Sequence, residues 1–190
     1  MKINLNDMSR RAYEIAKDNG FHDKSTSEIA DLMMIITELS EMIQADRKNK
    51  RTVGRGSVIV KVWKGNQDVN VSNLYHDLLK GTVEEELADV VIRLLDFAGS
   101  RSIPLEIYTD RKVVGVYDIS TFSLPEWTMM IVMLITDSVR NYYTTTSEFI
   151  ESIIEMCYQY AEAYQIPLLD IVDIKMKYNE TRDHLHGCKY

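Results

Sequence analysis

Two stretches decide the fold of this chain, MMIITELSEMIQ at residues 33–44 and EEELADVVIRLLD at residues 84–96. In both, apolar residues recur every three or four positions, which is the period of a helix with one buried face. Helix breakers are scarce, since the 190 residues include only three prolines and eight glycines. We therefore expect an all-α fold in a single domain over residues 1–190, an antiparallel bundle of about six helices with small extended insertions.

The expected helices follow from the same period and from cap residues at their ends. Ser25-x-x-Glu28 has the form of a capping box, so the second helix begins at Ser25 or Ser27, and Thr82 is a plausible cap of the third. Residues 51–73 lose the period and predict a flexible excursion or a small hairpin, and 103–120 predict a strand pair around Gly115. The expected helices cover residues 5–18, from 25 or 27 to about 48, 82–101, 124–143, 147–164 and 167–182.

Composition limits the class of protein. The chain has 29 acidic and 22 basic side chains, and a net charge of −7 argues against binding nucleic acid or an anionic membrane. No apolar targeting segment opens the sequence, and the apolar stretch 129–135 is too short to span a bilayer. Cys157 and Cys188 lie far apart in no metal-binding spacing. We expect a cytoplasmic protein with reduced thiols.

Four acidic residues carry the chemistry. Glu38 and Glu41 are three positions apart, which places both carboxylates on one face of a helix, and Glu86 and Asp89 repeat this spacing. Two antiparallel helices with such pairs can bring four carboxylates together, and oxygen-rich anionic sites bind Mg²⁺ or Mn²⁺. A solvated acidic face is the alternative, because a single Glu-x-x-Glu is common.

The arrangement of these acids resembles a known family. TELSEMIQADRK around Glu38 and Glu41, followed by EEELADVVIRLLDFAG around Glu86 and Asp89, is similar to the MazG-like nucleotide pyrophosphohydrolases of the all-α NTP pyrophosphatase superfamily. The C-terminal KMKYNETRDHLHGCKY also resembles that family's closing Lys-x-x-x-Asn-x-x-Arg. The segment between the two acidic pairs is longer than is usual for the family.

The resemblance implies hydrolysis of a (d)NTP to the monophosphate and pyrophosphate, in house-cleaning of the nucleotide pool. It implies Mg²⁺, or Mn²⁺, held by Glu38, Glu41, Glu86 and Asp89, with one carboxylate acting as the base for the attacking water. The substrate would be a nucleoside triphosphate. Two alternatives remain, a phosphoribosyl-ATP pyrophosphohydrolase and a catalytically silent binding or regulatory protein on the same scaffold.

Further residues are assigned to substrate with the help of the resemblance. Lys175, Asn179 and Arg182 would share one face of the last helix and contact phosphate or sugar, although a solvated basic helix end is the alternative. His22 is expected to contact the base, or else to lie at the surface. Trp63 is either a base platform or a packing residue.

Two residues near Asp89 have more ordinary assignments. Arg93 lies four positions after Asp89 and is expected to pair with it along the helix. Asp96 is a candidate to support the metal site from outside.

The sequence also contains an internal repeat. Residues 84–107 align with 147–170 at a constant offset, and Ile-Pro-Leu recurs at 103–105 and 166–168. The second copy keeps only one of the four acids, because Asp137 and Arg140 stand where Glu38 and Glu41 would repeat, and Phe149 and Ser152 stand in place of Glu86 and Asp89. We expect a tandem duplication, with a catalytic half at 1–107 and a degenerate half at 121–190 that completes the bundle as a second subunit would. A homodimer and a pseudo-dimeric monomer both remain open.

Overall fold

The computed structural model describes residues 3–52, 56–65, 70–105, 107–108, 121–140 and 146–187. Within these ranges the chain forms eight α-helices, which confirms the all-α bundle. A single pair of two-residue strands accompanies them in the described part. The elements are β1 Ile3–Asn4, α1 Leu5–Asp18, α2 Glu28–Arg47, α3 Gly56–Gly65, α4 Val71–Leu78, α5 Val83–Ser100, β2 Ile107–Tyr108, α6 Leu124–Arg140, α7 Ser147–Ala163, α8 Leu168–Asn179 and a short 3₁₀ turn at His184–Gly187.

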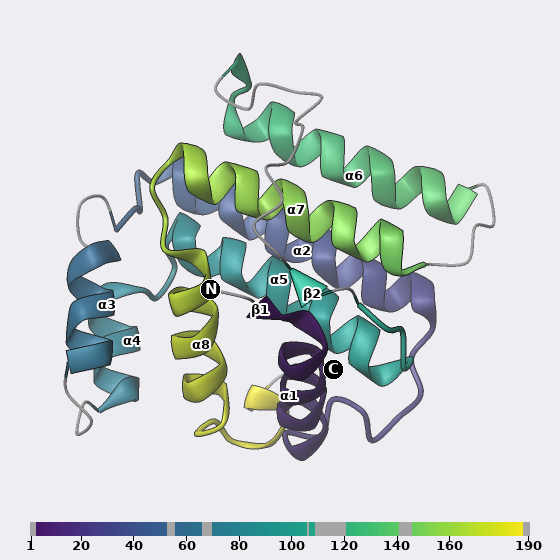
Figure 1. Ribbon diagram of the computed structural model, residues 1–190, viewed down its shortest axis with the longest axis horizontal. Helices are drawn as coiled ribbons and strands as arrows, with labels where there is room; N and C mark the ends of the chain where they lie inside the picture. Colours follow the sequence, from purple (N-terminus) through teal and green to yellow (C-terminus); the bar gives the residue numbers. More distant parts are fainter. Residues whose placement is uncertain are drawn as a thin grey trace.

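Helix α5 is the centre of the bundle. It packs against α1, α2, α7 and α8, and residues on all sides of it are buried, as expected of a helix inside a core. Figure 1 shows α6 and α7 running across the top of the molecule, while α1 and α8 lie below at a steep angle to them. Strands β1 and β2 are antiparallel, with Ile3 opposite Tyr108.

The helix starts follow local cap chemistry. The Thr82 side chain accepts a hydrogen bond from the backbone N–H of Glu85 and caps α5, as the sequence predicts. Ser27 caps α2 by accepting from Ala30 N–H. The capping box at Ser25 is therefore wrong, because the helix begins two residues later than that motif requires.

Helices α5 and α7 end in the same way before their Ile-Pro-Leu segments. Ser102 and Gln165 adopt positive φ angles of 54° and 55°, and the next residue's N–H reaches back to Ala98 in α5 or Ala161 in α7. Helices α1 and α2 end with the same pattern, at Gly20 and Asn49. The cap is thus common to four helices and is not specific to the repeat.

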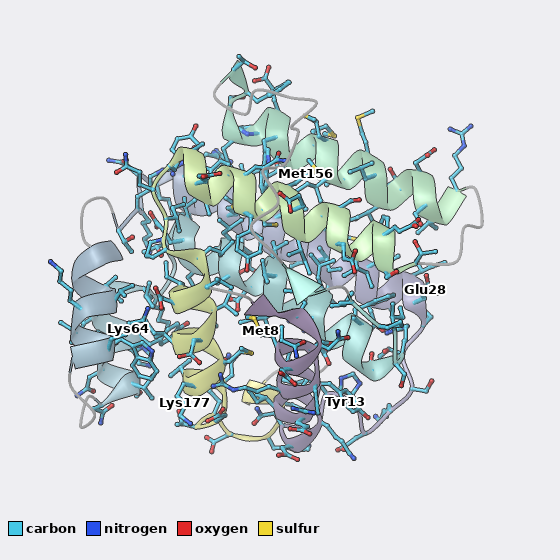
Figure 2. The ribbon with its side chains drawn as sticks, viewed as in Figure 1. Met8, Tyr13, Glu28, Lys64, Met156 and Lys177 are labelled. Atoms are coloured by element: carbon cyan, nitrogen blue, oxygen red, sulfur yellow. The ribbon has the colours of Figure 1, made fainter. Side chains whose placement is uncertain are left out.

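Residues 51–73 correct the sequence analysis, because they contain α3 and the start of α4, where an excursion or hairpin was expected. Their β-branched residues disfavour a helix locally, but tertiary packing outweighs propensity. Ile59 is buried, and Trp63 Nε1 donates to Asp173 Oδ2 of α8 at 3.0 Å. Lys64, which Figure 2 labels on α3, pairs with Asp170 of α8. These contacts fix α3 against α8 and confirm the packing role of Trp63. With these two helices the described ranges contain eight helices, where about six were expected.

Two smaller differences concern the C-terminal helix and the strand pair. Helix α8 begins one residue after Pro167, which occupies the cap position, and it ends at Asn179. Arg182 therefore lies in the turn that follows and not on the helix face that the sequence predicted. The strand pair expected around Gly115 lies outside the described residues.

No helix in the described ranges is both long and apolar enough to cross a membrane.

Helices α1 and α5 lie close together at Gly99. A Cβ atom there would lie 2.7 Å from the carbonyl oxygen of Ser9 and 2.8 Å from Cβ of Tyr13. We expect Gly99→Ala to lower the free energy of unfolding by about 1–3 kcal/mol, because the helices must move apart. Urea denaturation measures this, with the exposed Glu14→Ala as control. A stability equal to that of the control would contradict the close approach.

Candidate active site

Three carboxylates from two helices meet beside the core. Glu38 and Glu41 on α2 and Glu86 on α5 each present an oxygen, and these oxygens all lie within 4.8 Å of one another. Glu38 and Glu86 are each 8% exposed, whereas Glu41 is open to solvent. The structure thus brings together three of the four predicted ligands. Asp89 lies one turn further along α5 and borders the same cavity.

The first turn of α5 carries three consecutive glutamates, all of them buried, and they differ in their partners. Glu84 Oε2 accepts a hydrogen bond from Thr52 N–H at 3.0 Å. Glu86 has no side-chain hydrogen bond or ion pair within the described part of the chain. A buried carboxylate without a partner is unfavourable, so Glu86 is the acid whose surroundings most need a cation.

Glu85 and Asp89 share one cation. The buried Lys175 ammonium contacts Glu85 Oε1 and lies 2.8 Å from Asp89 Oδ2. Glu85 also accepts hydrogen bonds from the Tyr75 hydroxyl and from Gly81 N–H. Lys175 therefore lies inside the acidic cluster, with its charge already balanced.

Arg93 pairs with a different acid from the one expected. Its Nε donates to Glu38 Oε1 at 2.9 Å, joining α5 to α2, whereas the i, i+4 spacing predicts a pair with Asp89 along α5. The i, i+4 spacing permits that pair, but Lys175 already holds Asp89. Arg93 instead orients one of the three clustered carboxylates.

Burial and mutual repulsion shift the ionisation of these acids. Burial raises the pKa of Glu86 to about 8, and the neighbouring charges of Asp89, Glu85 and Glu41 add to the rise. Burial also raises the pKa of Asp89, against the opposing effect of Lys175. Burial alone would lower the pKa of Lys175, but Asp89 and Glu85 raise it above its ordinary value. The lysine is therefore charged at neutral pH.

The carboxylates face a cavity of about 480 Å³, within the size range of small-molecule sites. One wall is apolar and comes from α1, α2, α5 and the residue after Gly20. The rest is polar or charged. The apolar wall comprises Ala12, Ile15, Ala16, Phe21, Met34 and Ile92, and the polar remainder includes Lys80, Arg93, Lys175, Asn179 and Arg182.

Four cations line the cavity, and they fall into two pairs. Arg93 and Lys175 are committed to carboxylates. Lys80 and Arg182 have no carboxylate partner in the described ranges, although the Arg182 guanidinium lies 5.7 Å from the Tyr178 ring centre. Two positive charges are thus free to meet an anionic ligand at this cavity.

Asn179 borders the cavity with an unused acceptor. Its Oδ1 is buried and has no hydrogen-bond partner among the residues that the structure describes, while its backbone carbonyl accepts from Asn19 Nδ2 at 3.0 Å. Unpaired buried acceptors are uncommon in folded proteins. The side chain is therefore placed to receive a donor from a bound molecule.

His22 lies beside the cavity and is not among the residues that line it. Its Nε2 is 2.7 Å from Asp96 Oδ1, and its ring meets Tyr13 edge-on. The hydrogen bond to Asp96 raises the pKa of His22. Asp96 lines the cavity, and so do the aromatic side chains of Phe21 and Tyr75.

Sequence reasoning missed Lys80, Glu85 and the wall provided by α1. A signal for Lys80 exists, since Lys80-Gly81 directly precedes the capped acidic turn of α5. Glu85 was hidden in a run of three glutamates whose burial no local pattern distinguishes. The α1 wall depends on tertiary packing alone.

The second half holds no comparable cluster among its described residues. Asp137 and Arg140 lie on α6 beside a separate, mainly apolar groove that includes Met156 of α7 (Figure 2). The acid set of the first half fits a hard divalent cation, which prefers carboxylate oxygens.

Comparisons with known proteins add no support to these assignments, which rest on the geometry of the site. No protein-family model matches the chain, and searches of curated proteins and of solved structures find no similar protein.

Glu86 makes folding stability depend on pH in the absence of metal. The folded state holds its proton up to about pH 8, whereas the unfolded chain releases it near pH 4.5. The contribution of Glu86 to the free energy of unfolding is thus full below pH 4.5 and is lost as the pH rises to about 8. Between these values the free energy of unfolding falls by at most about 1.4 kcal/mol per pH unit. We expect Glu86→Gln to flatten this fall in urea denaturation with EDTA. Parallel curves for variant and wild type would contradict the shift.

Proposed function

We propose that the protein is a Mg²⁺-dependent nucleoside triphosphate pyrophosphohydrolase that converts a (d)NTP to the monophosphate and pyrophosphate. One observation carries the proposal: three carboxylate oxygens lie within 4.8 Å of one another in a cavity that is also lined by two cations without carboxylate partners in the described parts of the chain. A divalent cation would match the three carboxylates, and the phosphates of a polyphosphate would match the two cations. The resemblance of the acidic motifs to MazG-like enzymes points the same way.

Glu38, Glu41 and Glu86 would hold Mg²⁺, or Mn²⁺, with Asp89 at the edge of the set. The bound ion would neutralise charge on the phosphate oxygens and on the leaving pyrophosphate. Arg93 keeps Glu38 oriented. Glu41 is exposed and has no hydrogen-bond partner in the described chain, so it is the carboxylate best placed to accept a proton from the attacking water.

The cavity also divides into regions suited to the parts of a nucleotide. Lys80 and Arg182 would bind the phosphates, Arg182 with its planar guanidinium. The free Oδ1 of Asn179 would accept a hydrogen bond from the substrate. The apolar wall formed by α1 and Phe21 offers a surface for the base. Removal of noncanonical or surplus nucleotides is the role we propose for such an activity.

The second half would complete the bundle. Helix α7 packs on α5, and α6 packs on α2, so the acid-bearing helices are covered by helices from within the same chain. This supports the proposal of a pseudo-dimeric chain in which one half supplies the metal ligands.

The activity is tested by pyrophosphate release from the common NTPs and dNTPs and from phosphoribosyl-ATP, with and without Mg²⁺. We expect Mg²⁺-dependent release that Glu38→Gln reduces at least about a hundredfold, because a cluster ligand is lost. Asp137→Asn, at the equivalent position of the second half, should leave turnover nearly intact. Equal losses in the two variants would contradict the asymmetry, and no release from any substrate would contradict the function.

Lys80 is expected to act through substrate binding. Lys80→Met should raise the KM for the nucleotide about tenfold, since a charge-assisted contact to phosphate is lost, while Mg²⁺ affinity measured without nucleotide stays unchanged. The exposed Lys48, which lies outside the cavity lining, supplies the control variant Lys48→Met. A KM that responds equally to both substitutions would show a general effect of charge.

A further inference from the structure

Lys175 is a buried cation at the cavity, paired with two carboxylates. Its side chain is 6% exposed, and its ammonium contacts Glu85 and lies 2.8 Å from Asp89 Oδ2. It also donates to the Tyr75 hydroxyl at 3.2 Å and lies 4.8 Å from the centre of that ring. All three ammonium protons therefore have acceptors.

These contacts join three helices at the cavity that the clustered carboxylates face. Lys175 comes from α8, Tyr75 from α4, and Glu85 and Asp89 from α5. The rings of Tyr75 and Tyr178 stack with centres 3.8 Å apart, which joins α4 to α8 a second time. The position of the ammonium is thus determined from several sides.

Asp89 is held by one oxygen only. Its Oδ2 is paired with Lys175, while its Oδ1 has no hydrogen bond within the described ranges. The carboxylate lines the cavity next to Glu86 and is 17% exposed. The contact with Lys175 restrains the position of one oxygen and leaves the other oxygen available to a cation.

We infer that Lys175 is a positioning residue of the metal centre, which holds Asp89 in place, and that it does not bind the substrate's phosphates. To reach a phosphate its ammonium would have to leave two buried carboxylates, and breaking a buried ion pair on one side is strongly unfavourable. Lys80 and Arg182 line the same cavity without that constraint. The inference rests on the proposed function only in that the metal centre serves hydrolysis.

The test uses a substitution that preserves charge. Lys175→Met alone would leave Glu85 and Asp89 buried without a counter-charge. The double variant Glu85→Gln/Lys175→Met keeps the net charge of the three side chains unchanged but removes the anchor of Asp89. Glu85→Gln alone retains the Lys175–Asp89 pair and serves as its control.

The measurement is Mn²⁺ affinity without nucleotide, by electron paramagnetic resonance, on variants that unfold cooperatively in urea. We expect the double variant to bind Mn²⁺ about tenfold more weakly than Glu85→Gln, the usual cost of losing a partner that orients a metal ligand. The nucleotide KM at saturating Mn²⁺ should stay within about twofold, whereas Arg182→Met should raise that KM and leave Mn²⁺ affinity unchanged.

Asp89→Asn gives a second readout that does not depend on removing the buried lysine. It should lose as much Mn²⁺ affinity as the double variant, and combining them should add no further loss. Unchanged Mn²⁺ affinity in Asp89→Asn, or a raised KM with unchanged Mn²⁺ affinity in the double variant, overturns the inference. A wild-type protein that binds no Mn²⁺ overturns it together with the proposed function. Mn²⁺ binding without pyrophosphate release overturns the proposed function alone.

Discussion

The burial of acidic side chains on α5 is the constraint on which the rest of the structure depends. A carboxylate removed from water must find a cation, hydrogen-bond donors or a proton. The acids in the first two turns of α5 meet this requirement in three ways. Glu84 takes a backbone N–H, Glu85 and Asp89 take a lysine, and Glu86 holds its proton up to about pH 8.

The partners of these acids arrange the surrounding chain. The segment after α2 is held at Thr52, and α8 is held through Lys175, whose neighbours include Tyr75 of α4. The N-terminal turn of α5 is also where the helix dipole favours negative charge, which lowers the cost of placing three glutamates there. Electrostatics and packing thus converge on the same end of one helix, and the cavity lies beside it.

Much of this could be predicted from the sequence. Apolar periodicity located α1, α2, α5, α6 and α7 closely, and the two acidic pairs pointed to the cluster. Helix α3 could not be predicted because its β-branched residues and terminal glycines disfavour a helix locally, and packing against α8 outweighs that preference. Helix α4 has only eight residues, which is too short for an apolar period to be recognised. The partner of Arg93 could not be predicted either, since choosing Glu38 over Asp89 depends on a lysine that is more than eighty residues away in the chain. Spacing in the sequence shows which side chains can reach one another along a helix. Which of these pairs forms depends on the partners that other helices bring close.

Residues from both halves of the chain border the cavity. The clustered carboxylates come from α2 and α5, whereas Asn179 and Arg182 come from α8 and the turn after it. Under the proposed function, the metal ligands, Lys80 and the apolar wall belong to the first half, while Asn179 and Arg182 of the second half complete the substrate site. The contacts made by α8 and the turn after it can therefore change in evolution without any change in the two helices that carry the clustered carboxylates.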